Sequence, residues 1–370
     1  MTSTRLPTVA NLTIPLISST VAPALTTSRS VSASNTTTTT FAILIAIIIV
    51  AGVLGNLFVV GVIVYDRKML ASPVNQLLLQ LAIADMGNLI FCSPDAAMAL
   101  LDRGWLLPNV ACPIIRFLQE YSLYASVLFQ MTIGIERFMA ICTPMRMQRF
   151  SSRTTIIVTS GIWTMAAAFA FPYFLHMGIV HHFCYWMNIG NKTKLLFKYA
   201  EFLVLYALPL VMLTGVYTVM GRVLWGSSET IASEQQQVAI LKLRRSVVKM
   251  LIISMLLYFL CYTPIQGLFI MEAFFNVYIA LPKWLRLLFN ALSVMSSSLN
   301  PIVYIMCCRH FHSRFMAIVR SLTNWTVCCT QSSYSFVNGN TDRATGFSRS
   351  PYVSLKRYGF QMEGQSVSAF

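Results

Sequence analysis

Ionisable side chains interrupt several long apolar stretches of this chain, and each of them is a candidate for chemistry. Asp85 stands alone inside one apolar run, and Glu136 and Arg137 lie together near the end of another. A charge in such a run needs a partner or a proton, because burying it unpaired costs free energy. The sequence contains no His-Glu-x-x-His, no Gly-x-Ser-x-Gly and no paired intramembrane acids of the protease type. We therefore expect a role other than catalysis.

Seven apolar runs must position these residues. Hydrophobic residues make up 56% of the chain and charged residues only 11%, against about a quarter in soluble domains. Each run reaches the length of about 20 residues that spans a bilayer. The runs lie at roughly 41–65, 74–101, 109–143, 154–175, 197–224, 244–275 and 283–306. The sequence predicts an all-α membrane protein, a seven-helix bundle.

Basic residues orient this bundle. They gather in alternate gaps, after the first, third and seventh runs and before the sixth, which places those gaps in the cytoplasm and the N-terminus outside. We expect a multi-pass protein of the plasma membrane. The formal net charge of +15 is spread over short segments rather than over a soluble domain, so no nucleic acid is expected as a partner.

The segments outside the runs divide the chain further. Residues 1–40 are predicted to be a disordered extracellular arm, 41–306 the bundle, 307–322 a short amphipathic helix on the inner membrane surface, and 323–370 a disordered cytoplasmic tail. Candidate modification sites are the glycosylation sequons at Asn11, Asn35 and Asn191 and the palmitoylation sites Cys328 and Cys329. The alternative for the two cysteines is that they stay reduced cytosolic thiols.

Short motifs occur in order along the seven runs. They are Gly55-Asn56, Leu81-Ala82-Ile83-Ala84-Asp85, Cys112, Glu136-Arg137-Phe138, Trp163, Pro172, Pro209, Tyr217, Cys261-Tyr262-Thr263-Pro264 and Asn300-Pro301-Ile302-Val303-Tyr304. Over about residues 41–322 this set resembles the rhodopsin-like (class A) G-protein-coupled receptors, and most closely the neuropeptide receptors among them. The resemblance implies a receptor that activates heterotrimeric G proteins when its sixth helix moves outward.

The resemblance also implies roles for particular residues. It predicts a Cys112–Cys184 disulfide over the mouth of the bundle, which argues against a metal site at His181, His182 and Cys184. It predicts a polar network that holds an allosteric sodium ion, formed by Asn56, Asp85, Ser126, Ser297 and Asn300, with Ser296 where the family usually has Asn. No other cofactor or metal is expected. The activation and coupling residues would be Glu136, Arg137, Tyr217, Pro264, Pro301 and Tyr304.

Two departures from the family pattern carry expectations of their own. Arg244 and Arg245 begin the sixth run where some members have an acid, so a direct lock from Arg137 to that helix is not expected. Like charges repel, and we therefore expect a weakly held off state with measurable basal activity. Tyr262 occupies the position of the family's switch Trp, and Tyr258 that of a Phe one turn earlier.

The predicted pocket narrows the ligand class. Gln119 stands where amine receptors have an Asp, and Val294 where opsins have the retinal-binding Lys, so neither class fits. Residues expected to face the ligand are Gln119, Glu120, Tyr124, Glu201, Tyr262, Gln266, Phe269, Glu272 and Asn290. Their acids favour a peptide with positive charge, although Arg116 and Arg286 could instead neutralise them internally. The alternatives are a small-molecule or lipid receptor, a constitutively active orphan and, more remotely, a transporter.

Further partners are predicted from the chain's end and from the family. Tail serines such as Ser332 and Ser348 are candidates for phosphorylation and arrestin recruitment. The final Ser368-Ala369-Phe370 fits a ligand of PDZ domains. Membrane lipids surround the bundle and the inner amphipathic helix.

Overall fold

Seven helical spans are long and apolar enough to cross a membrane in the computed structural model. It describes residues 27–101, 104–143, 151–180, 182–187, 189–226, 235–275 and 281–321, without the side chains of 27–35, 191, 235–240 and 272–275. The spans are α1 (Thr27–Tyr65), α3 (Pro73–Leu101), α4 (Ala111–Cys142), α5 (Ser152–His176), the continuous run α6 (Asn191–Phe202), π-helix η1 (Leu203–Ala207) and α7 (Leu208–Gly226), then α8 (Gln235–Phe275) and α9 (Lys283–Cys307). The predicted seven-helix membrane bundle is confirmed.

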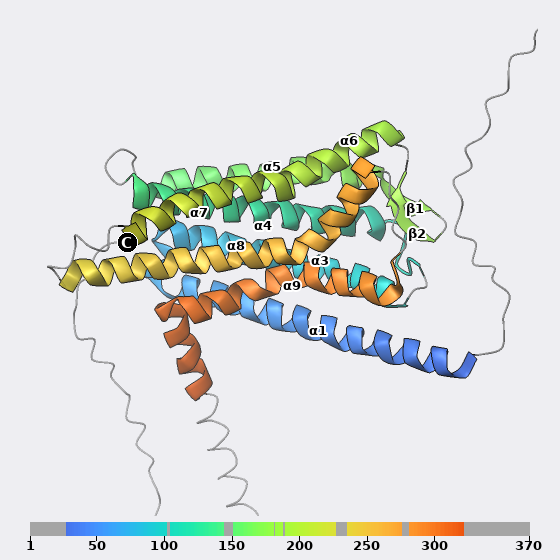
Figure 1. The fold of residues 1–370 in the computed structure, drawn as a ribbon, viewed down its shortest axis with the longest axis horizontal. Helices are drawn as coiled ribbons and strands as arrows, with labels where there is room; N and C mark the ends of the chain where they lie inside the picture. Colours follow the sequence, from blue (N-terminus) through green and yellow to red (C-terminus); the bar gives the residue numbers. More distant parts are fainter. Residues whose placement is uncertain are drawn as a thin grey trace, which may run out of the picture.

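The remaining described elements mark the two ends of the bundle. Strands β1 (Met177–Val180) and β2 (Phe183–Trp186) form a hairpin at one end, which we call the disulfide end. The other end carries α2 (Arg67–Leu70) and a helix over 309–321, and we call it the Arg137 end. In Figure 1 this last helix turns away from the axis of α9. It corresponds to the predicted amphipathic helix, with Phe311 buried and Arg309 exposed.

Helix α1 begins earlier than the sequence suggested. It starts at Thr27, inside the segment 1–40 that we expected to be a disordered arm. Threonine hydroxyls can bond to the carbonyl one turn back, and the hydroxyl of Thr40 donates to the oxygen of Thr36 over 2.9 Å. Residues 1–26 lie outside the described residues, as do residue 322 and the predicted tail 323–370.

Helix α4 is the centre of the bundle. It packs against α3, α5, α7 and α8, while α9 lies between α1 and α8 (Figure 1). A close approach of α4 to α7 depends on Gly134, because a Cβ there would stand 2.8 Å from a methyl carbon of Leu213. Large apolar side chains such as Val211 and Leu260 face outward, where lipid is their natural solvent. Polar side chains such as Asp85 and Asn300 are buried inside.

Three prolines within the spans leave backbone carbonyls that side chains then satisfy. A proline at position i cannot donate to the carbonyl at i−4, and hydrocarbon offers no water in its place. Pro94, Pro209 and Pro301 affect Ile90, Leu205 and Ser297 in this way. Their oxygens accept from the Ser93 hydroxyl (2.7 Å), the Tyr258 hydroxyl (2.7 Å) and the Asn56 amide (3.1 Å), respectively. The second and third bonds join different helices, α8 to η1 and α1 to α9.

Candidate functional site

A disulfide and the hairpin cover the disulfide end. Cys112 at the start of α4 is bonded to Cys184 in β2, with Cα atoms 5.7 Å apart, which confirms the predicted bridge. The backbone N–H of Trp105 donates to the oxygen of His182 over 2.6 Å. Gly104 makes this contact possible, because its φ is +78° and a Cβ there would meet the same oxygen. The hairpin is therefore fixed at two points, to α4 and to the segment between α3 and α4.

No metal site accompanies this arrangement in the part of the chain that the structure describes. No group of three or more His, Cys, Asp or Glu side chains there could hold a metal ion. Cys184 is already in the disulfide, and His181 lies outside the described residues.

A cavity of about 440 Å³ lies beneath the hairpin, between α3, α4, α6, η1, α8 and α9. Its wall includes Phe183 and Cys184 of β2, so the hairpin contributes directly to it. A volume of this size falls within the range of sites for drug-sized ligands. Six of the nine residues predicted to contact a ligand line it: Gln119, Glu120, Glu201, Tyr262, Gln266 and Asn290.

The other three predicted contacts stand differently. Tyr124 is 2% exposed and packs its ring 5.5 Å from that of Phe169, so it lies behind the cavity wall. Phe269 is packed between the rings of Tyr199 and Phe202, each 5.9 Å away, and is held in the contact of α8 with α6. Neither lines the cavity, because aromatic neighbours within the bundle take up their rings. The side chain of Glu272 lies outside the described residues.

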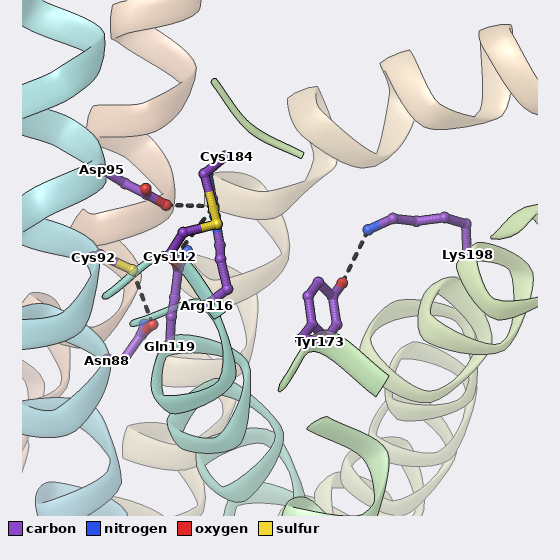
Figure 2. A network of polar contacts seen from close by, with 9 residues as sticks. All are labelled: Asn88, Cys92, Asp95, Cys112, Arg116, Gln119, Tyr173, Cys184 and Lys198. Carbon is purple, nitrogen blue, oxygen red and sulfur yellow. Dashed lines mark hydrogen bonds and ion pairs between the residues drawn. A yellow bond between two sulfur atoms is a disulfide. The ribbon is translucent and has the colours of Figure 1, made fainter. Parts of the chain in front are cut away.

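Two of the three acids in the cavity wall already have basic partners. Arg116 on α4 forms an ion pair with Asp95 on α3, as Figure 2 shows, and it also reaches Gln119. Glu201 accepts from Lys198 and from the Tyr173 hydroxyl, each over 2.7 Å. The sequence predicted Arg116 as a base that could neutralise an acid of the cavity, but it did not predict Lys198 in that role. The spacing of three residues between Lys198 and Glu201 on a helix was the available signal.

Glu120 differs from the other two acids. It exposes 9% of its surface, and its Oε2 atom has no hydrogen-bond partner among the described residues. Arg286, the second base considered as a neutralising partner, lines the same cavity near the beginning of α9, together with Lys283.

Aromatic residues of α8 form the wall where the cavity meets the core. Tyr262 lines the cavity and stacks on Tyr258, with ring centroids 4.7 Å apart. Tyr258 in turn donates to the Leu205 oxygen in η1. The tyrosines that replace the family's usual residues thus connect the cavity to a π-helical turn, a type of irregularity that is common at functional sites.

The predicted polar network around Asp85 is assembled in the bundle core. One carboxylate oxygen of Asp85 accepts from Ser126 and the other from Asn300, both over 2.7 Å. Asn56 donates to the main-chain oxygen of Ser297 over 3.1 Å. All five predicted residues are buried and drawn from α1, α3, α4 and α9. Whether they hold sodium stays a prediction.

Asn88 is a member of this region that sequence reasoning missed. It lines the cavity, donates to the Ser297 hydroxyl over 3.0 Å and accepts from the Cys92 thiol (Figure 2). It therefore touches both the cavity and the network that contains Asp85. Its position three residues after Asp85, on the same helix face, was the signal that could have found it.

At the Arg137 end, two of the predicted coupling residues are in direct contact. Arg137 donates to its neighbour Glu136 over 2.6 Å, so the expected charge pair is present. Tyr217 on α7 and Tyr304 on α9 are both buried. Arg137 lines a second cavity of about 170 Å³, together with Arg244 and Leu251 of α8. Pro264 and Pro301 lie within α8 and α9, as predicted.

Two adjacent residues of α8 hold its Arg137 end against both neighbours. Arg245 donates twice to the main-chain oxygen of Leu224 at the end of α7, over 3.0 and 2.8 Å, and lies over the Trp225 ring. Ser246 donates to the oxygen of Cys307 at the end of α9 over 2.5 Å. These carbonyls belong to last helical turns, where intrahelical donors run out. We call the Arg245 and Ser246 contacts the α8 latch.

Several predicted modification sites are not placed by the structure. Asn11, Cys328 and Cys329 lie outside the described residues. Asn35 and Asn191 belong to α1 and α6, but their side chains are not described. Glycosylation and palmitoylation at these positions stay predictions.

Comparison with known proteins agrees with this geometry. The family model described as 7 transmembrane receptor (rhodopsin family) matches residues 55–304. The chain is 33% identical to neuropeptide receptor 15 of Caenorhabditis elegans, over 74% of this chain and 88% of that receptor. It is 29% identical to the human neuromedin-K receptor over 80% of this chain and 64% of that receptor. It is 25% identical to a QRFP-like peptide receptor of Branchiostoma floridae over 75% of this chain and 77% of that receptor.

Proposed function

This chain belongs to the rhodopsin family of seven-transmembrane receptors, and from that premise we propose that it binds an extracellular peptide and activates a heterotrimeric G protein. The observation that carries the proposal is the cavity under the disulfide-fixed hairpin, with polar and charged side chains converging on it. The relatives reported above support a peptide as the ligand, because two of them are named as receptors for peptides. A lipid would favour an apolar wall, whereas Glu120, Glu201 and Gln266 make this one polar.

The proposed orientation places the disulfide end outside the cell and the Arg137 end in the cytoplasm, within the plasma membrane. A disulfide persists in an oxidising compartment, which supports the placement of Cys112 and Cys184. Arg309, Arg314 and Arg320 lie at the opposite end, as the positive-inside rule requires for a cytoplasmic face. The sequence has another sequon at Asn324, on the proposed cytoplasmic side. A glycan attached to Asn324, but not to Asn191, would contradict this orientation.

Activation is proposed to proceed by outward movement of α8 at the Arg137 end. Ligand contact at Tyr262 would act on Tyr258 and its bond to the Leu205 oxygen in η1. Outward movement would also break both contacts of the α8 latch and widen the cavity at Arg137. The G protein would enter that widened cavity. A ligand shifts this equilibrium only by its difference in affinity for the two states.

The Asp85 network is proposed to bind a sodium ion that favours the inactive state. Carboxylate and hydroxyl oxygens of Asp85 and Ser126 are the ligand type that hard cations prefer. Both oxygens of Asp85 already accept hydrogen bonds, so the ion would compete with Asn300 for one of them. Agonist affinity that is independent of sodium chloride, with choline chloride as the matched salt, would argue against this site.

Other proposed partners depend on residues outside the described ranges. Phosphorylated tail serines would recruit arrestin, and the final Ser368-Ala369-Phe370 would bind a PDZ domain. The helix over 309–321 would lie on the inner membrane surface, with Phe315 and Ile318, both exposed on the protein, inserted among lipids.

The function is tested in cells that express the full chain and report calcium and cyclic nucleotides. The cells are exposed to a library of amidated peptides, and Arg137→Ala serves as the signalling-deficient control. We expect at least one peptide to raise a signal that the control loses at equal surface expression. A chain at the cell surface that responds to lipids or small molecules, and to no peptide, would contradict the peptide part of the proposal.

A further inference from the structure

Among the described residues, two of the three acids in the wall of the main cavity belong to ion pairs, and the third, Glu120, does not. Arg116 forms an ion pair with Asp95, and Lys198 forms one with Glu201. Each pair is internal to the protein and close to neutral. Glu120 lies on the same wall and keeps one carboxylate oxygen without a hydrogen-bond partner among the described residues. A buried polar group without a partner is costly, so a ligand cation in the cavity, toward which the Glu120 side chain turns, would be favoured.

A second unsatisfied atom lies one helical turn away. The buried Nε atom of Arg116 has no hydrogen-bond acceptor among the described residues, although other atoms of that guanidinium bind Asp95 and Gln119. Residues four apart on a helix lie about 5–6 Å from each other at their Cβ atoms. On α4, therefore, a carboxylate oxygen of Glu120 lacks a hydrogen-bond donor and the Nε–H of Arg116 lacks an acceptor. The two residues are about one turn apart.

Depth along the helices separates Glu120 from Lys283 and Arg286, two other cations of the cavity wall. Glu120 lies eight residues after Cys112 in α4, about 12 Å further along the helix than the disulfide. Lys283 and Arg286 stand in the first turn of α9, at the disulfide end. The cavity is consequently basic near its opening and acidic further in.

We infer that the ligand is a peptide with a basic side chain, Arg or Lys, that inserts to Glu120 while a backbone carbonyl of the same peptide reaches Arg116. This inference rests on the proposed function and adds the chemistry of the ligand to it. A basic residue carries both groups, because its carbonyl oxygen and its cationic end are separated by several bonds. The cation supplies the donor that Glu120 lacks, and the carbonyl supplies the acceptor that Arg116 lacks.

The first experiment measures binding without requiring any signal. The purified receptor is heated with N-acetyl-arginine amide or with N-acetyl-citrulline amide, a neutral counterpart of nearly the same shape. We expect the arginine compound to raise the melting temperature and the citrulline compound to leave it unchanged. In Glu120→Gln the difference disappears, whereas Glu120→Asp keeps it. Asp66→Asn is the control, because it removes a carboxylate at the Arg137 end, outside the cavity wall, and it keeps the difference as well.

The second experiment uses peptides that activate the receptor in cells. Each active peptide is made again with citrulline in place of arginine at one position. The replacement should lower potency roughly 10- to 100-fold on the wild type, the effect expected for a buried charge-assisted hydrogen bond. On Glu120→Gln the two peptides should become nearly equal in potency. Surface expression of each variant is measured in parallel.

The outcomes distinguish this inference from the proposed function. Activation by peptides that show no preference for arginine over citrulline would overturn the inference and leave the function standing. Stabilisation by the arginine compound that depends on Glu120, in a receptor that no peptide activates, would support the cation site and contradict the function. Equal behaviour of the wild type and Glu120→Gln with the two compounds would overturn the inference.

Discussion

The hydroxyl of Tyr258 donates to the main-chain oxygen of Leu205 and so joins α8 to the π-helical turn η1. Pro209 cannot supply the N–H that α-helical pairing would direct to that oxygen. The pair thus satisfies a backbone group in the membrane interior and also connects two spans that must separate if α8 moves outward. We therefore expect the Tyr258–Leu205 bond to stabilise both the fold and the inactive state of the receptor.

Tyr258→Phe should therefore destabilise the receptor and raise its signalling without ligand. The change removes only the hydroxyl and leaves the ring stack on Tyr262 in place. Interhelical hydrogen bonds in membrane proteins contribute up to roughly 2 kcal/mol, so the loss in unfolding free energy should be of about that size. Thermal inactivation of ligand binding and basal cyclic nucleotide or calcium are the measurements. An unchanged midpoint together with unchanged basal output would show that the bond matters to neither.

Arg245→Ala should raise basal signalling above that of the wild type. The guanidinium donates two hydrogen bonds to the Leu224 oxygen at the end of α7. Alanine at position 245 has no side-chain donor to replace them. Measurable basal activity of the wild type stays our prediction, and the α8 latch is the contact that we expect to limit it. Lys242→Ala is the matched control, because this exposed base lies on the same part of α8. Equal basal output of the two variants, per receptor at the surface, would refute the role of Arg245.

Asn88→Leu should weaken the link between ligand binding and signalling more than binding itself. Asn88 lines the cavity and also bonds the Ser297 hydroxyl, next to the Asp85 network. We expect peptide affinity to change only a few-fold, and maximal response to fall, when the amide is lost. Ser297→Ala should reproduce this result, and the double variant should be no worse than either single one, because both remove the same bond. Additive losses would show that the two residues act separately.

Cys112→Ser and Cys184→Ser should each impair ligand binding and lower the amount of folded receptor at the surface. The bridge closes a loop of sequence separation 72 and fixes the hairpin that forms part of the cavity wall. Bridges of this kind contribute roughly 2–4 kcal/mol. The double variant should behave like either single variant. Wild-type peptide affinity in the double variant would mean that the hairpin keeps its place without the bridge.

Much of the architecture was predictable because membrane burial imposes a length and a composition on each span. The positions of Asp85, Ser126 and Asn300 were predicted by motifs, and the structure brings them within 2.7 Å contacts. Side-chain directions were not predictable from the motifs. Tyr124 and Phe269 were expected in the cavity, but their rings pack against aromatic neighbours that lie far away in the sequence.

Two contacts that the motifs did not predict have different physical origins. Lys198 with Glu201 lies immediately before η1, where the helix departs from regular geometry. The Arg245 bond to the Leu224 oxygen depends on how α7 and α8 approach each other and on where α7 ends. Side chains that bind backbone oxygens have no fixed spacing along the sequence, so they become visible only when the helices are placed.

The three proline-linked carbonyls also constrain how this chain can vary. At Leu205, the tyrosine hydroxyl matters because the proline is present, so the two residues form an epistatic pair. Pro209→Ala would restore an N–H for the Leu205 oxygen, and in that background Tyr258→Phe should become nearly silent. The same logic couples Asn56 to Pro301 and Ser93 to Pro94. Substitutions at a proline and at its side-chain donor are therefore expected to be tolerated together more readily than one at a time.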